Sequence, residues 1–233
     1  MSGFIGLLGQ ISLPGIKFGG SGGPEEVTTV LEIVAALTVL TLAPSILIML
    51  TCFTRVLIVL SFLRHAIGAP QMPPNQIVTG LALFLTVFIM APVGQEVHRT
   101  ALGPYLNRQL KPAQAVERGW EPVRSFLLRH TRERDLGLMV ELGRGPRPAR
   151  PDDVTAHALI PAFVISELRT SFQLAFVIFV PFLVIDMVVA SLLMSMGMLM
   201  LPPMLISLPL KILLFVLADG WHLIVRSLVL SYQ

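Results

Sequence analysis

The stretch AFVISELRTSFQLAFVIFVPFLVIDMVVASLLMSM (162–196) is apolar for most of its length and ends just before a glycine. It is too long for a buried strand and long enough for a helix that crosses a membrane. Gly197 and then the pair Pro202 and Pro203 interrupt the helical pattern, and apolar residues resume beyond them. The sequence therefore predicts a helical hairpin over residues 157–233, with a non-helical bend at its glycine and prolines.

The composition of the chain is that of a membrane protein or of a subunit buried in a large assembly. Of its 233 residues, 54% are hydrophobic and 13% are charged, whereas soluble domains carry about 25% charged residues. The segment 95–156 holds 19 of the 31 charged side chains. We therefore predict a polar helical domain at 95–156 between two apolar blocks. The net charge of +3 is too small to indicate binding to nucleic acid.

The first apolar block, residues 27–94, also has the pattern of a helical hairpin. Ile33 to Thr54 carries no charge, is long enough to span a bilayer and contains a kinking proline, Pro44. The stretch HAIGAPQMPPNQ (65–76) predicts a turn before a second apolar helix at 77–93. The predicted fold class is all-α: long kinked helical hairpins around the polar domain, associated with a membrane.

Two further segments have local signals. Residues 1–26 contain the glycine-rich stretch LPGIKFGGSGG (13–23) and are expected to be a flexible tail or the remnant of a secretory signal at residues 1–9. Within the polar domain, Pro112 and Pro122 each suit the first turn of a helix.

The chain has no recognisable catalytic or metal site. Its five histidines are scattered, and the single cysteine, Cys52, excludes a thiolate cluster. It contains no phosphate-binding loop, nucleophile elbow or dinucleotide-binding turn. We therefore expect neither an enzyme nor a cofactor.

Several charged residues lie within or beside the apolar runs, where ionised groups are costly unless they are paired. They are Arg55, Glu167, Arg169, Asp186, Lys211 and Asp219. They indicate either a proton or substrate relay or structural pairs within or between subunits. We favour pairs, because no relay spacing recurs. Asp186 and Lys211 are 13 and 12 residues from the bend centre at Leu199, which allows them to face each other.

Four methionines alternate through the predicted bend: Met194, Met196, Met198 and Met200. On a helix, residues two apart point about 200° from each other, whereas in an extended segment they share one side. The run is therefore apolar filler, a thioether site for Cu(I), or a flexible constriction. A constriction requires an oligomer, because one loop cannot close a ring.

Three stretches of the chain are familiar: MLTCFTRVLIVLSFLRHAIGAPQMPPNQIVTGLALFLTVFIMAPV (49–93), FLLRHTRERDLGLM (126–139) and LIPAFVISELRTSFQLAFVIFVPFLVIDMVVASLLMSMGMLMLPPMLISLPLKILLFVLADGWHLIV (159–225). They resemble the FliP family of flagellar biosynthetic proteins and its counterparts in virulence-type secretion systems. LPGI (13–16) resembles the start of the mature chain in members made with a cleaved signal.

The resemblance implies a non-enzymatic subunit of the type III export gate, through whose central channel unfolded flagellar proteins pass. It implies a homo-oligomer, commonly a pentamer, that assembles with the FliQ and FliR proteins and other export components. The expected location is the bacterial inner membrane within the flagellar basal body, with the domain 95–156 on the periplasmic side.

The resemblance also implies a gate loop. The family's methionine-rich run maps onto Met198, Leu199 and Met200 as the pore gasket, and Gly197, Pro202 and Pro203 are the expected hinge of that loop. Leu199 departs from the run of three methionines that many relatives have.

Three alternatives stay open: a virulence-type export gate, a secondary transporter or ion channel, and a Cu(I) transporter. The stretch HAIG…PPNQ favours the flagellar system, again by resemblance. A transporter would act alone or as a small oligomer, and a copper site would hold stoichiometric metal.

Overall fold

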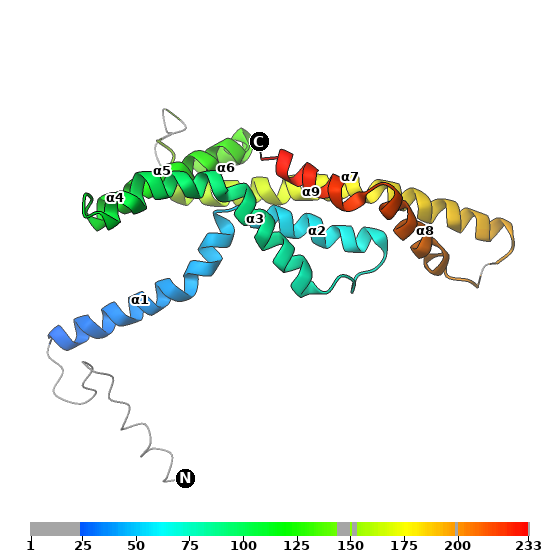
Figure 1. The fold of residues 1–233 in the computed structure, drawn as a ribbon, viewed down its shortest axis with the longest axis horizontal. Helices are drawn as coiled ribbons and strands as arrows, with labels where there is room; N and C mark the ends of the chain where they lie inside the picture. Colours follow the sequence, from blue (N-terminus) through cyan, green and yellow to red (C-terminus); the bar gives the residue numbers. More distant parts are fainter. Residues whose placement is uncertain (1–23, 144–149, 151–152, 199, 233) are drawn as a thin grey trace, which may run out of the picture. The chain divides into compact units, whose positions relative to one another are not determined.

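The structure is a computed structural model that describes residues 24–143, 150, 153–198 and 200–232. Over these residues every regular element is a helix and no strand occurs (Figure 1), so the predicted all-α class is confirmed. Residues 1–9 and 13–16, which carry the predictions about a signal, lie outside the described residues.

The chain divides into two compact units, Met1–Ser45 and Ile46–Gln233. Helix α1 (Pro24–Met49) begins three residues before the predicted start of the apolar block, and its residues up to Ser45 are the described part of the first unit. Leu31, Leu37 and Leu40 of α1 are each more than half exposed. Apolar side chains thus point outward from this helix, as they do on helices that another molecule or a bilayer covers.

The predicted 22-residue span Ile33–Thr54 is not a single helix, because α1 ends at Met49 and α2 begins at Phe53. Thr51 lies at the break. Its hydroxyl donates to the carbonyl of Ile48 at 3.4 Å and accepts from the backbone N–H of Phe53 at 3.4 Å. A threonine side chain that bonds to nearby backbone groups competes with the helix ladder.

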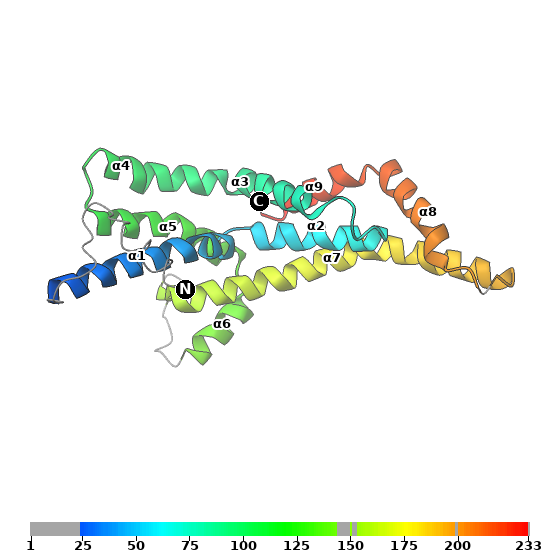
Figure 2. The same cartoon turned by 90° about the horizontal axis from the view of Figure 1, so that it is seen from below.

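The second unit is built on three helices: α2 (Phe53–Ile67), α3 (Asn75–Val97) and α7 (Ala156–Ser195). Helix α2 contacts both α3 and α7 and lies between them (Figure 2). Val56, Val59, Leu60 and Leu63 of α2 are almost completely buried, at the spacing that places them on one side of a helix. These side chains form the centre of the hydrophobic core.

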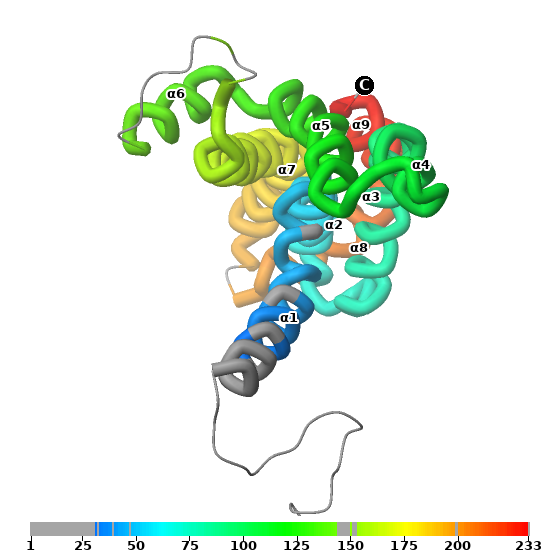
Figure 3. The backbone as a smooth tube through the Cα atoms, turned by 90° about the vertical axis from the view of Figure 1, so that its left-hand side faces the viewer, coloured from blue at the N-terminus to red at the C-terminus, as the bar shows by residue number. Residues whose placement is uncertain are grey.

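The polar segment folds as short helices at one end of this layer. Helix α3 continues through a π-helical turn, η2 (His98–Leu102), into α4 (Gly103–Leu106). Helix α5 (Pro112–His130) packs on η2, α3 and α7, and α6 (Glu133–Leu142) packs on α7 (Figure 3).

The predicted helix starts in this segment are partly correct. Helix α5 begins at Pro112, as expected, but it runs through Pro122, so the prediction of a second start there is wrong. The chain instead breaks at Thr131, whose backbone is extended and whose hydroxyl donates to the carbonyl of Leu127 at 2.7 Å.

Helix α7 has 40 residues, which corresponds to about 60 Å at 1.5 Å per residue. Helix α8 (Pro203–Leu217) follows the methionine-rich bend, and α9 (Gly220–Leu230) continues from it at a bend of 63°. Asn75–Leu106 and Ala156–Ser195 are long and apolar enough to cross a membrane, and α8 with α9 is a third candidate if the bent pair is one span.

Candidate functional site

The end of α7 is a Schellman motif. The backbone N–H of Gly197 donates to the carbonyl of Met194 at 3.1 Å, and that of Met198 donates to the carbonyl of Leu193 at 3.0 Å. This pattern requires a left-handed residue after the helix, and Gly197 supplies it with φ of 73°. Among the described residues, no neighbouring atom lies within 4 Å of a Cβ built on Gly197, so these neighbours leave room for a side chain and the left-handed backbone is what favours glycine.

The bend presents its methionine side chains to the outside. Met194, Met196 and Met204 are 60–69% exposed, and Met200 is 97% exposed. Met198 is more covered, at 39%. Leu199, the third residue of the predicted gasket, lies outside the described residues. An apolar tip this exposed indicates a surface that another molecule covers.

The predicted hinge residues lie on both sides of this tip. Gly197 ends α7, Pro202 is the N-cap of α8, and Pro203 is its first residue. Proline suits a first helical turn, because the missing N–H has no partner there in any case. These residues thus mark where α7 ends and where α8 begins. Their role as a hinge stays a prediction.

Asp186 of α7 and Lys211 of α8 face each other across the hairpin. The ammonium of Lys211 donates to Asp186 Oδ2 at 2.5 Å and to the backbone carbonyl of Ala66 at 3.2 Å. Lys211 is buried, whereas the Asp186 side chain is 38% exposed. The contact with Ala66 places the cation at the C-terminal end of α2, where the helix dipole favours positive charge.

Arg55 of α2 and Glu167 of α7 form a second, fully buried ion pair. Arg55 donates through Nε to Glu167 Oε2 at 2.9 Å and through Nη2 to Oε1. Arg55 is 3% exposed and Glu167 is 0% exposed. This two-pronged geometry satisfies both carboxylate oxygens and is the strongest arrangement for such a pair. It joins the two helices that carry most of the core.

Two residues that the sequence analysis missed complete this pair. The hydroxyl of Tyr232 donates to Glu167 Oε2, and Arg55 Nη1 donates to the hydroxyl and carbonyl of Ser231 at 3.0 and 3.3 Å. The Arg55 guanidinium also lies over the Tyr232 ring, 3.9 Å from its centroid. The segment after α9 is therefore tied to α2 and α7. The sequence signal for this contact is weak: Ser231 and Tyr232 place two hydroxyl groups directly after the apolar residues that end α9.

An aromatic group from α5 covers the same cluster. Phe126 stacks on Tyr232 with ring centroids 6.0 Å apart, and the His130 ring lies 5.0 Å from Tyr232. Burial lowers the pKa of His130 below its ordinary value, and the hydrogen bond to the Phe126 carbonyl opposes this only in part. At neutral pH the imidazole is therefore uncharged, which suits a ring packed near the Arg55 guanidinium.

The remaining two predicted charges are not brought into a pair. Arg169 of α7 and Asp219 at the start of α9 are both exposed, and within the described part of the chain neither forms a salt bridge. Asp219 has a left-handed backbone with φ of 50° and no side-chain capping bond. Its place in the fold is the bend between α8 and α9.

Gly220 makes that bend possible. A Cβ built on Gly220 would lie 2.2 Å from the Phe215 ring, far inside van der Waals contact. The Phe215 ring also meets Trp221 edge-on, with centroids 5.5 Å apart. At the bend between α8 and α9, the Phe215 ring therefore packs directly on the backbone of Gly220.

The site combines an exposed apolar loop with ion pairs between helices. Over the residues that can be described, no three histidine, cysteine, aspartate or glutamate side chains gather as a metal ion requires. The apolar loop lies between α7 and α8, and the partly buried pair Asp186–Lys211 joins these two helices.

The sequence of this chain is similar to those of known proteins. A family model described as "FliP family" matches residues 36–228. The chain is 51% identical over 212 residues to the flagellar biosynthetic protein FliP of Bacillus subtilis (strain 168), covering 91% of this chain and 96% of that protein. It is 50% identical over 210 residues to the protein of the same name from Pectobacterium carotovorum subsp. carotovorum, covering 90% and 81%. With the Aquifex aeolicus (strain VF5) protein of that name the identity is 46% over 213 residues, covering 91% and 89%.

Proposed function

Since this chain belongs to the FliP family, we propose that it is a channel-forming subunit of the flagellar type III protein export gate. Unfolded flagellar proteins pass through a central pore that several copies of the methionine-rich loop seal. The chain carries out no reaction of its own, and the proton motive force and an associated ATPase supply the energy.

The observation that carries the proposal is the exposed loop between α7 and α8. A Schellman motif ends α7 at a fixed residue, two prolines fix the start of α8, and the methionines between them project outward. Methionine is unbranched and adaptable. A ring of such loops therefore seals the empty pore and also fits around a passing polypeptide. One copy cannot form that ring.

The assembly follows from the same requirement. We propose a homo-oligomer, a pentamer by resemblance, that forms together with FliQ and FliR in the inner membrane at the flagellar basal body. The polar segment 95–156 then lies on the periplasmic side. Purification of the chain with FliQ and FliR, followed by imaging of the particle, tests the copy number and the orientation.

The gasket role is tested by replacing Met198, Leu199 and Met200 together with glycine. In vesicles that contain the assembled subunits, the variant is expected to release an entrapped small dye that the wild-type assembly retains. The matched control is Met194→Ala with Met204→Ala, two methionines that are each 60% exposed but lie on helices. A triple variant that stays as tight as this control would contradict the proposal.

The alternative of a Cu(I) transporter makes a different prediction. Thioether ligands suit Cu(I), so a copper site in the loop would retain about one ion per chain after dialysis. Metal analysis of the purified protein decides between the two, because a gasket needs no bound metal.

A further inference from the structure

The segment after α9 is fastened at a place where a titratable side chain lies against it. Ser231 and Tyr232, here called the latch, bind the ion pair of Arg55 and Glu167. The ring of His130 in α5 lies against the same segment, with its centroid 5.0 Å from that of Tyr232. The imidazole is half-buried, whereas Glu167 is fully buried, so of the two groups His130 is the one that protons from solvent reach.

The hydrogen bond of His130 determines which of its nitrogens takes up a proton. Nδ1 lies 2.8 Å from the carbonyl oxygen of Phe126, which can only accept, so the neutral ring carries its hydrogen on Nδ1. A second proton therefore binds at Nε2. The charged imidazole would then be a second cation against the Tyr232 ring, which already has the Arg55 guanidinium 3.9 Å from its centroid.

The acid of this cluster, Glu167, is already fully engaged. Arg55 donates to both of its oxygens, and Tyr232 donates to Oε2. On α6, the buried Asp135 accepts from Ser166 Oγ at 2.7 Å. Further charged side chains on α5, α6, α7 and α9 are exposed: Arg129, Glu133, Arg134, Arg169 and Arg226.

The groups around His130 act on its pKa in opposite directions. Burial has the largest effect and lowers the pKa, and the Arg55 guanidinium lowers it further. The Phe126 carbonyl, the Glu167 carboxylate and the backbone of Tyr232 raise it, but the balance lies below the ordinary value of 6.5. The arrangement with the latch bound therefore favours the uncharged imidazole.

We propose that His130 is a pH sensor for the latch: protonation at Nε2 releases Ser231 and Tyr232 from the ion pair and so frees the end of α9 from α2 and α7. Helix α8 is the helix that α9 contacts most, so α8 and α9 are expected to loosen together. The release is a property of the single chain, and it goes beyond the proposed export function without resting on it.

The pH range of the release follows from the direction of the pKa shift. Because the bound latch lowers the pKa of His130, the stability that the neutral ring gives to the latch is complete above pH of about 6.5 and is lost as the pH falls below it. If the released form titrates at about 6.5, the ratio of released to bound latch rises by at most about thirtyfold from about pH 7.5 to about pH 5.

Fluorine NMR of the full chain in detergent measures this ratio. The chain has two tyrosines, Tyr105 and Tyr232, so incorporation of meta-fluorotyrosine gives two signals, which Tyr105→Phe assigns. Tyr105 is 42% exposed and serves as the internal reference. Saturation transfer between the bound and released positions of the Tyr232 signal gives their ratio, which is expected to rise with falling pH within the thirtyfold limit.

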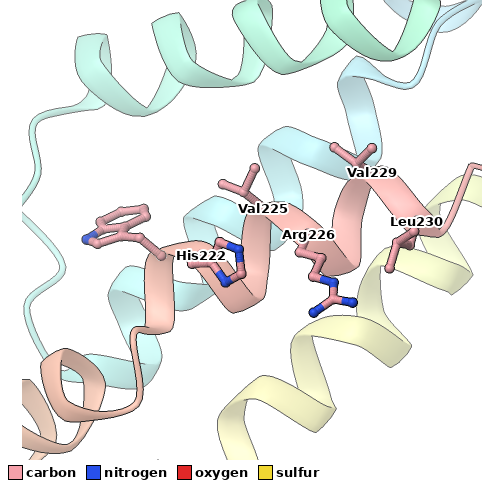
Figure 4. A pocket seen from close by; sticks show the side chains of 6 residues that line it. His222, Val225, Arg226, Val229 and Leu230 are labelled. Carbon is pink, nitrogen blue, oxygen red and sulfur yellow. The ribbon is translucent and has the colours of Figure 1, made fainter.

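Three variants connect the release to His130. His130→Gln cannot take up a proton and is expected to keep the ratio constant within about twofold over the same pH range. His130→Arg carries a permanent cation and is expected to raise the ratio already at neutral pH. The matched control is His222→Gln, which is expected to titrate as the wild type does. Figure 4 shows His222 near the start of α9 and Leu230, which precedes the latch, at the other end.

The wild-type titration stands without any variant, and four results would overturn the proposal. One is a wild-type ratio that does not change with pH, and another is a released form that cannot be detected at about pH 5. The third is an equal rise in His130→Gln, which would assign the release to a different acid. The fourth is loss of the helical circular dichroism signal in step with the release, which would show unfolding of the whole chain.

Discussion

At the scale of single residues, the buried pair Arg55–Glu167 joins α2 to α7. Arg55 and Glu167 lie in the core, and every strong donor and acceptor between them is used by the pair itself or by Ser231 and Tyr232. A buried pair of this kind adds little net stability compared with apolar side chains, but removal of one partner leaves an uncompensated charge.

Glu167→Gln is therefore expected to be severely destabilising. The change keeps the shape of the side chain and leaves the Arg55 charge buried, which costs about 3 to 5 kcal/mol in the free energy of unfolding. Denaturant unfolding in detergent, followed by circular dichroism, measures this loss of stability.

Tyr232→Phe removes one hydrogen bond to a charged group and is expected to cost about 1.5 to 3 kcal/mol in the free energy of unfolding.

The control for Glu167→Gln is Glu96→Gln, which breaks an exposed ion pair with Arg99 on one turn of helix. Exposed pairs contribute little, so this variant is expected to unfold with the wild type. If the two glutamine variants unfolded at the same denaturant concentration, the buried pair would not have the importance given to it here.

At the scale of elements, two glycines decide where helices stop and turn. Gly197 and Gly94 both have open space where a Cβ would be added, but Gly197 is left-handed and Gly94 lies inside α3. Gly197→Ala is expected to destabilise the bend by about 1 to 2 kcal/mol, and Gly94→Ala is expected to be neutral or slightly stabilising. Thermal unfolding of the two variants side by side measures the difference, and equal melting temperatures would show that the Schellman motif does not form.

Gly220→Ala tests the bend between α8 and α9. The added methyl would lie 2.2 Å from the Phe215 ring, so the ring or the helix must move and the 63° bend is expected to change. A pair of spin labels on α8 and α9 reports the distance across the bend. Phe215→Leu in the same chain is expected to restore the wild-type distance in part, and an unchanged distance in Gly220→Ala alone would refute the steric argument.

The sequence predicts some elements better than others, for physical reasons. The apolar runs, the turn before α3 and the break at Gly197 carry strong local signals, and the counts from the bend to Asp186 and Lys211 place that pair correctly. The break at Thr51 and the passage of α5 through Pro122 depend on side-chain bonds and packing that no periodicity encodes. The partners of Arg55 lie 112 and 176 positions away, so only the tertiary fold reveals them.

At the scale of the whole molecule, the pair Asp186–Lys211 links the hairpin to α2 and so to the rest of the second unit. Asp186→Asn leaves the buried Lys211 ammonium with the Ala66 carbonyl as its remaining partner. If the proposed assembly with FliQ and FliR forms, the variant is expected to yield less of it, measured by size-exclusion chromatography of the co-purified complex. Arg169→Gln is the matched control, and normal assembly of Asp186→Asn would refute the role of the pair.

The length of α7 has a consequence for the life of the newly made chain. A helix of about 60 Å is twice the thickness of a bilayer's hydrocarbon core, which is about 30 Å, so lipid alone cannot cover it when it stands upright. Phe172, Phe176 and Met187 are among its outward side chains and are each more than half exposed. A solitary copy is therefore poorly solvated both in water and in the membrane. We therefore expect a copy that is made without neighbouring subunits to be lost from the cell faster than an assembled one.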